Sequence, residues 1–140
     1  MKETLTPGLT HEFTYKVPSS KTVPYLYPEA DEFQVMPKVL ATGFLVGLVE
    51  WVCIQMINPH IDWPDEQTVG VGITINHTAA TPPGFNVTIK TNLISVKGSR
   101  LEIEFTAHDG ADPICKGTHE RFIINSEKFN RNVEKKAALN

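Results

Sequence analysis

Two periodicities of apolar residues run along the chain, and they predict different elements. From residue 39 to residue 58, apolar side chains recur every four positions, at Leu40, Phe44, Leu48, Val52 and Met56. Val49, Cys53 and Ile57 lie beside this stripe, so the pattern predicts a helix that is apolar around most of its circumference. Such a helix belongs in the centre of a fold, and Pro59 marks its end.

Alternation with a period of two predicts strands on both sides of this helix. These strands are residues 11–17 before the helix, and residues 68–78, 85–96, 101–107 and 114–124 after it. The alternation in 85–96 changes phase partway, and residues 97–99 and 108–110 have the composition of tight turns. One strand, a long helix and four antiparallel strands predict an α+β fold in which the sheet wraps around a single helix.

The remaining segments have few apolar residues or many prolines. Residues 18–38 contain Pro18, Pro24, Pro28 and Pro37, which predicts an ordered surface loop with at most one helical turn at 31–36. Residues 126–140 begin with a polar stretch that predicts a short helix or a frayed tail. With no repeat or low-complexity tract, residues 1–140 are expected to form a single domain.

Composition and charge narrow the classes of partner. The chain has 41% hydrophobic and 21% charged residues and a net charge of −3, which is ordinary for a soluble protein and gives no electrostatic reason to bind nucleic acid or an anionic membrane. No apolar leader begins the sequence, and Glu50 interrupts the longest apolar run, so we expect a cytoplasmic protein without a membrane span. Cys53 and Cys115 are isolated and are expected to be buried thiols.

Glu50 is the unusual residue of the predicted helix. Leu48, Val49, Trp51 and Val52 surround it angularly, so an unpaired charge there would cost several kcal/mol. The ordinary alternative is a carboxylate at the helix edge in contact with water or an arginine. A buried carboxylate would instead be paired with a cation, a metal or an imidazole.

Thr42, Gly43 and His77 extend this hypothesis. Thr42 has an ordinary interpretation as the helix N-cap. Gly43 would let a ligand approach the backbone, and a helix N-terminus favours a carbonyl oxygen that develops negative charge. If His77, at the end of a strand, contacted both Thr42 and Glu50, the three would form a hydroxyl, imidazole and carboxylate series that activates an alcohol. Thr42 and Glu50 are about 12 Å apart along a helix axis, and the imidazole between them belongs to the same chain or to another.

Five blocks of sequence resemble those of a known enzyme family. They are YLYPE at 25–29, ATGFLVGLVEW at 41–51, GITINHTAATPPG at 72–84, TAHDG at 106–110 and GTHER at 117–121. Together they are similar in order and spacing to the bacterial fluoroacetyl-CoA thioesterases, over roughly residues 11 to 133. The resemblance implies a hotdog fold, a homodimer, and hydrolysis of a short-chain acyl-CoA, with CoA as part of the substrate and no separate cofactor.

The resemblance also implies roles for particular residues. The family's catalytic threonine, glutamate and histidine fall on Thr42, Glu50 and His77. Its substrate-binding glycine and arginine fall on Gly70 and Arg121.

One departure from the family concerns the lid over the acyl group. The first lid phenylalanine falls on Phe33, whereas the second lid position is Met36. A flexible thioether lacks the electrostatics of an aromatic ring, so a preference for fluoroacetyl over acetyl does not follow from the resemblance.

Two other functions are compatible with the same fold. One is a non-catalytic acyl-CoA-binding protein, and the other is an enoyl-thioester hydratase or dehydratase. The presence of Thr42, Glu50 and His77 together favours the thioesterase, because a binding protein needs no acid–base pair. The sequence has no phosphate-binding loop, no dinucleotide fingerprint and no metal-spaced cluster of histidine and cysteine, so no metal site is predicted.

Overall fold

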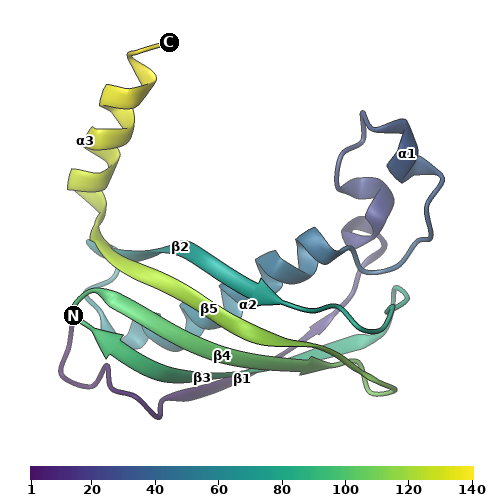
Figure 1. The fold of residues 1–140 in the computed structure, drawn as a ribbon, viewed down its shortest axis with the longest axis horizontal. Coiled ribbons are helices and arrows are strands. Elements are labelled where there is room, and N and C mark those ends of the chain that lie inside the picture. Colours follow the sequence, from purple (N-terminus) through teal and green to yellow (C-terminus); the bar gives the residue numbers. More distant parts are fainter.

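A five-stranded antiparallel sheet lies against one long helix in the computed structural model, which describes residues 1–140 (Figure 1). The strands are β1 (Thr10–Lys16), β2 (Glu66–Ile75), β3 (Asn86–Lys97), β4 (Arg100–His108) and β5 (Pro113–Asn125). Their order in the sheet is β1-β3-β4-β5-β2, so β1 and β2 form the two edges. The helices are α1 (Asp31–Gln34), α2 (Thr42–Ile57) and α3 (Ser126–Ala137), with short 3-10 turns at 19–21, 23–25 and 58–60. The predicted α+β architecture is confirmed.

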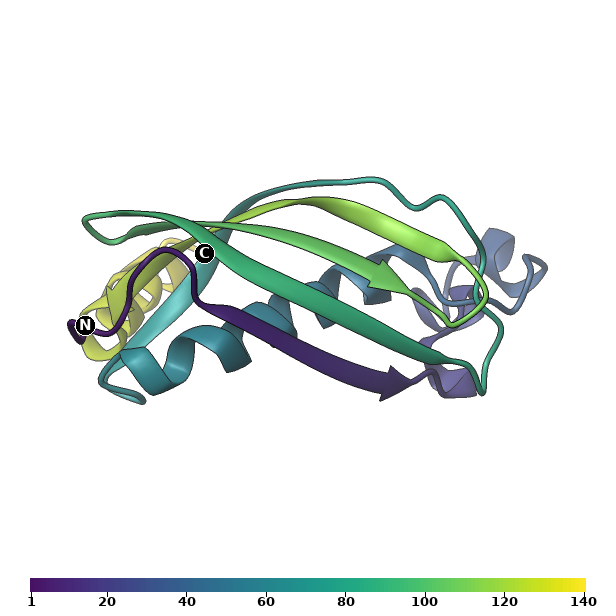
Figure 2. The ribbon, with the colours of Figure 1, turned by 90° about the horizontal axis from the view of Figure 1, so that it is seen from below.

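Helix α2 lies across one face of the sheet, as the view from below shows (Figure 2). A cluster of 21 buried apolar residues fills the space between them. Leu45, Val49 and Val52 contribute from the helix, and all three have 0% of their surface exposed. Cys53 and Cys115 are buried free thiols, as expected, and burial raises their pKa to about 12 and about 11.

The helix begins three residues later than its apolar pattern predicts. Leu40 forms an isolated bridge with Thr22, and its N–H donates to Thr81 O at 2.8 Å. These bonds hold residue 40 in extended structure, and Ala41 takes the N-cap position with extended dihedral angles. Thr42 is therefore the first helical residue and not the N-cap, which corrects the simpler interpretation of that residue.

Two irregularities modify the sheet. The predicted change of phase in β3 corresponds to a register shift between Leu93 and Ser95 in its pairing with β4. A second shift interrupts the pairing of β2 with β5 between Gly70 and Gly72. Val71, the residue between these glycines, is 49% exposed.

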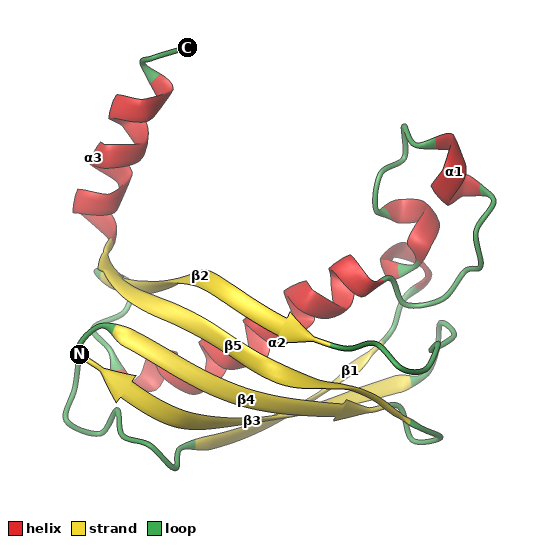
Figure 3. Ribbon diagram, in the orientation of Figure 1, coloured by secondary structure: helices red, strands yellow, loops and turns green.

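Two segments project beyond the sheet at opposite ends of α2 (Figure 3). Residues 18–38 form short helical turns next to the start of α2, including the predicted turn at α1. The polar C-terminal stretch forms α3, which begins where the Asn125 side chain accepts a hydrogen bond from Lys128 N. No residue of α3 is buried.

Part of α2 has no cover in the single chain. Trp51 is 46% exposed, and Phe44, Val46 and Ile54 are only partly buried. The stretch Thr42–His60 is long and apolar enough, by length and composition alone, to cross a membrane. The core helix of a soluble protein has the same properties, and α2 packs its apolar side chains on the sheet.

Candidate active site

The start of α2 and the end of β2 bring a hydroxyl and an imidazole together. Thr42 Oγ1 lies 2.7 Å from His77 Nδ1. Burial lowers the pKa of His77, so the imidazole is neutral near pH 7 and its free nitrogen accepts a hydrogen bond from the hydroxyl. The other nitrogen, Nε2, is buried without a hydrogen-bond partner in the chain. The predicted contact between Thr42 and His77 is therefore present, with one nitrogen of the ring still unpaired.

A buried hydrogen-bond clamp positions the loop that carries His77. Thr81 Oγ1 donates to Asp109 Oδ2 at 2.8 Å, and Asp109 Oδ1 accepts from the N–H groups of Ala111 and Asp112. Thr81 O accepts from Leu40 N directly before α2. The loop after β2 is thus tied both to the β4–β5 turn and to the helix start. Sequence reasoning assigned no role to Thr81 and Asp109, although both lie in the blocks that carry the family resemblance.

Glu50 belongs to a second group, centred on Arg121. Arg121 Nη1 donates to Glu50 Oε1 at 3.0 Å, and its Nε and Nη2 donate to Oγ1 and O of Thr68, both at 2.8 Å. The Arg121 side chain is 4% exposed, whereas that of Glu50 is 40% exposed. Within one chain, Glu50 is therefore a partly exposed carboxylate in contact with an arginine, which is the ordinary alternative, and its partner is not an imidazole. Its apolar neighbours along the helix face the sheet or remain uncovered, so they do not enclose it.

His119 and Gly70 complete this second group. His119 Nδ1 donates to Gly72 O at 2.7 Å, and His119 Nε2 accepts from Arg121 Nη1 at 3.1 Å. Burial lowers the pKa of His119, which agrees with a neutral ring in this arrangement. A Cβ atom at Gly70 would lie 2.7 Å from Glu50 Oε1. Gly70 thus makes room for the carboxylate, a function that its neighbours in sequence do not reveal.

The two groups remain apart within one chain. Glu50 follows Thr42 by eight residues, which is about 12 Å along the helix axis. The imidazole does not bridge this distance, because His77 contacts Thr42 while Glu50 contacts Arg121. Of the two alternatives that the sequence leaves open, a single chain therefore does not form the whole series of hydroxyl, imidazole and carboxylate.

The predicted lid residues lie on the projecting segment. Phe33 stacks on Tyr27 with ring centroids 6.1 Å apart, and Met36 is 45% exposed. Leu26 of the same segment packs on the start of α2, where a Cβ atom at Gly43 would lie 2.9 Å from Leu26 Cδ2. Gly43 therefore accommodates a side chain of this segment, which holds it beside Thr42.

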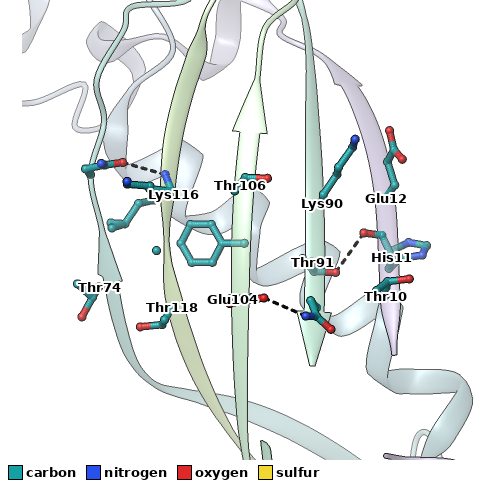
Figure 4. A pocket seen from close by; sticks show the side chains of 15 residues that line it. Thr10, His11, Glu12, Thr74, Lys90, Thr91, Glu104, Thr106, Lys116 and Thr118 are labelled. Carbon is teal, nitrogen blue, oxygen red and sulfur yellow. Dashed lines mark hydrogen bonds between the residues drawn. The ribbon is translucent and has the colours of Figure 1, made fainter. Parts of the chain in front are cut away.

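A large hollow lies elsewhere, on the face of the sheet that points away from α2 (Figure 4). Its volume is about 1000 Å³, and polar side chains of all five strands line it, among them Lys90, Glu104 and Lys116. It contains none of the predicted site residues. The chemistry of the groups at α2 identifies the candidate site better than the size of this hollow.

A sheet wrapped around one helix, with a hydroxyl–imidazole pair at the helix start, defines a hotdog-fold protein of the thioesterase kind. Solved structures support the fold, since a hot-dog-like protein from Thermanaerovibrio acidaminovorans superposes with a TM-score of 0.78 at 18% identity, covering 93% of this chain and 91% of its own. The chain belongs to the family of fluoroacetyl-CoA-specific thioesterases, whose family model matches residues 26–127.

Individual relatives agree with this membership. The fluoroacetyl-CoA thioesterase of Streptantibioticus cattleyicolor is 49% identical over an alignment of 138 positions, which covers 97% of this chain and 97% of the relative. A solved structure of the fluoroacetyl-CoA thioesterase FlK has a TM-score of 0.93 at 47% identity and covers 96% of this chain and 98% of its own. The resemblance seen in the sequence blocks is confirmed.

Proposed function

We propose that the protein hydrolyses a short-chain acyl-CoA to the free acid and CoA, as a cytoplasmic homodimer that needs no cofactor. The observation that carries this proposal is the 2.7 Å contact between Thr42 Oγ1 and His77 Nδ1 at the start of α2. The curated relative is named a fluoroacetyl-CoA thioesterase, and solved structures of variants of FlK contain fluoroacetate with CoA, or acetyl-CoA. These ligands indicate the class of substrate that we assign to this chain.

The mechanism uses groups at the first turn of α2. His77 accepts the hydroxyl proton while Thr42 Oγ1 attacks the thioester carbonyl carbon. The N–H groups of Thr42, Gly43 and Phe44 precede the first bond of the helix, which Leu45 N makes to Ala41 O, and they stabilise the charge on the carbonyl oxygen. As the C–S bond breaks, the imidazolium returns the proton to sulfur. Water then hydrolyses the threonine ester, with His77 again as the base.

Direct attack by water that His77 activates gives the same products. The two routes differ in whether an ester of Thr42 forms. Rapid quenching followed by mass spectrometry of the intact protein distinguishes them, because only the first route adds the mass of the acyl group to the chain.

The second half of the proposal is that a dimer completes the site. His77 Nε2 is buried and unpaired, and Glu50 keeps one carboxylate oxygen free on a side chain that is 40% exposed. Strand β2, whose Gly70 lies beside this carboxylate, has an unpaired edge with Val71 and Ile73 exposed, and an exposed apolar edge strand favours pairing with another chain. We infer that β2 pairs with its copy, so that Glu50 of the partner subunit accepts a hydrogen bond from His77 Nε2.

The other site residues have supporting roles in this proposal. Arg121 and Gly70 hold the Glu50 carboxylate in place at the edge of the substrate site. Phe33 and Met36, on the segment beside Thr42, cover the acyl group.

An assay of thiol release over a series of acyl-CoAs tests the function. We expect turnover of fluoroacetyl-CoA and acetyl-CoA and a loss of roughly 10² to 10⁴-fold in the His77→Ala variant, as for removal of a general base. Unchanged melting of this variant is the control for folding. Tight binding of acyl-CoA without thiol release by the wild-type protein would show a binding protein instead.

A mixed dimer tests whether the site is shared. Thr42→Ala and Glu50→Gln chains, each with a different affinity tag, are co-expressed, and the heterodimer is isolated by both tags. If each site takes Thr42 from one chain and Glu50 from the other, one of the two sites is intact and the heterodimer has about half the wild-type rate. If each chain forms its own site, both sites carry a lesion and the heterodimer is as inactive as the parent variants.

A further inference from the structure

A second cavity lies between β1 and α2, at the sheet edge opposite to β2. Its volume is about 280 Å³, and its lining includes Tyr15, Lys21, Phe44, Gly47, Leu48 and Trp51. An α-helix has 3.6 residues per turn, so Trp51 is on the side of α2 opposite to Thr42. The cavity is therefore separate from the Thr42–His77 pair, and Arg121 and Glu50 lie toward the β2 edge, away from it.

Gly47 opens this cavity. It lies inside α2, where glycine is less favourable than alanine. A Cβ atom at Gly47 would meet no atom within 4 Å, so neither packing nor backbone geometry requires a glycine at this position. The consequence of the missing side chain is open space beside Trp51.

One cation and an aromatic cluster define the character of the cavity. Trp51 is held edge-on by Phe13 and Tyr15, with ring centroids 5.0 and 6.1 Å away. Lys21 Nζ lies 4.9 Å from the centre of the Phe44 ring, and none of the five ion pairs of the chain includes Lys21. The cavity thus has apolar walls and a single ammonium group without an acidic partner.

We propose that this cavity is a second binding site, for a small monocarboxylate with an unbranched apolar tail. The tail would occupy the space beside Gly47 and Trp51, and the carboxylate would pair with Lys21. The size of the cavity is at the lower end of small-molecule sites, which span about 300 to 1,000 Å³, and this favours a compact ligand over a lipid or a peptide. The proposal does not depend on the thioesterase reaction.

Fluorescence of Trp51 tests the site. The chain has two tryptophans, so a Trp63→Phe background leaves Trp51 as the reporter. We expect butanoate, hexanoate and octanoate to change its emission, with the Kd falling about fifteenfold for each pair of added methylenes until the cavity is full. Hexylammonium should bind at least tenfold more weakly than hexanoate, because it places a cation beside Lys21.

Two variants assign the signal to the cavity. Gly47→Leu fills the space and should abolish the response, while thiol release and the dimer mass show that the variant is folded. Lys21→Gln should weaken hexanoate about tenfold and leave 1-hexanol unchanged. The proposal is overturned if Trp51 does not respond to octanoate, if Gly47→Leu binds like the parent, or if CoA competes with hexanoate, which would place binding in the active site.

Discussion

Glu50 owes its position to a glycine on one side and an arginine on the other. Arg121 is almost fully buried and donates three other hydrogen bonds, two to Thr68 and one to His119. These bonds hold the guanidinium in place, so it is a rigid donor to the carboxylate. Gly70 leaves the space that the carboxylate occupies. Glu50 is thus oriented by contacts that come from strands far away in sequence, and a change in either neighbour moves its charge.

The substitution Gly70→Ala isolates this effect. The new methyl group would lie 2.7 Å from Glu50 Oε1 and 3.3 Å from both Arg121 Nη1 and His119 Cε1. The carboxylate is the end of a flexible, partly exposed side chain, so we expect it to move, and Arg121 and His119 to give way by a few tenths of an ångström, at little cost in stability. A shift of about 1 Å in a catalytic group lowers the rate on the order of 10²-fold. Steady-state kinetics and thermal melting measure the two quantities. Gly72→Ala is the matched control, because its Cβ atom would meet only Glu120 at 3.7 Å, and equal losses in both variants would contradict this role of Gly70.

The ionisation of His77 gives a prediction for the pH dependence of activity. Burial lowers the pKa of His77 below the ordinary value of 6.5, and only the neutral ring accepts the proton of Thr42. In the proposed dimer, the carboxylate of Glu50 of the partner subunit opposes this effect, because it favours the imidazolium. The rate decreases as the pH falls through the pKa of His77, and we expect Glu50→Gln to move the acid limb of kcat/KM for acetyl-CoA to lower pH. An acid limb that does not move in Glu50→Gln, in a protein whose melting is unchanged over that range, would contradict the pairing of these two residues.

At the scale of the elements, the period of the apolar pattern predicts whether a segment is a helix or a strand better than it predicts the residues at which the segment begins and ends. The phase change in β3 was visible because a bulge exchanges the two faces of a strand, and Leu93 and Ser95 show where this occurs. The start of α2 was placed too early because Val39 and Leu40 continue the apolar pattern, whereas a bridge to Thr22 keeps Leu40 extended. An apolar residue indicates burial whether it lies in a helix or in a strand, so it does not show where one element ends and the next begins.

The candidate site was predictable in part for a related reason. The contact of Thr42 with His77 follows from a helix start and a strand end that lie close together in this fold. The pairing of Glu50 with Arg121 depends on the register of β5 against β2, where Arg121 is opposite Gly70. No pattern in α2 contains that register, so the neighbours of Glu50 along the helix indicated a deeper burial than the side chain has.

We expect the segment 18–38 to determine the selectivity between fluoroacetyl-CoA and acetyl-CoA. Phe33 of this segment stacks on Tyr27, whereas Met36 has no aromatic ring and is 45% exposed. A thioether discriminates poorly between two small acyl groups, and a hydrophobic wall provides only about 1 to 3 kcal/mol for such a distinction.

We expect Met36→Phe to raise the ratio of kcat/KM for fluoroacetyl-CoA to that for acetyl-CoA. Both substrates are measured on both proteins, with Val35→Phe, at a neighbouring position that is 87% exposed, as the control. A large ratio in the wild type that Met36→Phe leaves unmoved would place selectivity at Thr42 and His77 instead.

The whole molecule has more apolar surface than one chain covers. Helix α2 is apolar around its circumference but packs only one side on the sheet, and β2 has an unpaired edge on which Val71 is 49% exposed. Both features favour a second copy of the chain at this edge. The dimer that we propose for catalysis would cover the β2 edge and the side of α2 next to it, whereas the side of α2 that carries Trp51 faces β1.

A charge at the β2 edge tests this arrangement. We expect light scattering of the wild-type protein to give twice the 15.6 kDa mass of the chain. Val71→Lys should yield monomers and lose activity with them, because it places like charges opposite each other across the proposed interface. Thr106→Lys, on the outer face of the sheet, is the control and should remain dimeric and active. A monomeric wild-type protein at micromolar concentration would contradict the shared site.

The strand order has a consequence for the time course of folding. Strands β3, β4 and β5 follow one another in the chain and pair as neighbours, whereas β1 pairs with β3 and β2 pairs with β5 across long intervening segments. Pairings between distant parts of a chain form slowly, because the loop must close before any contact compensates for its lost entropy. The three-stranded centre is therefore expected to form first and the two edges last. Strand β2 positions Gly70 and the loop that carries His77. A newly made chain therefore forms the centre of its sheet before its catalytic residues reach their final positions.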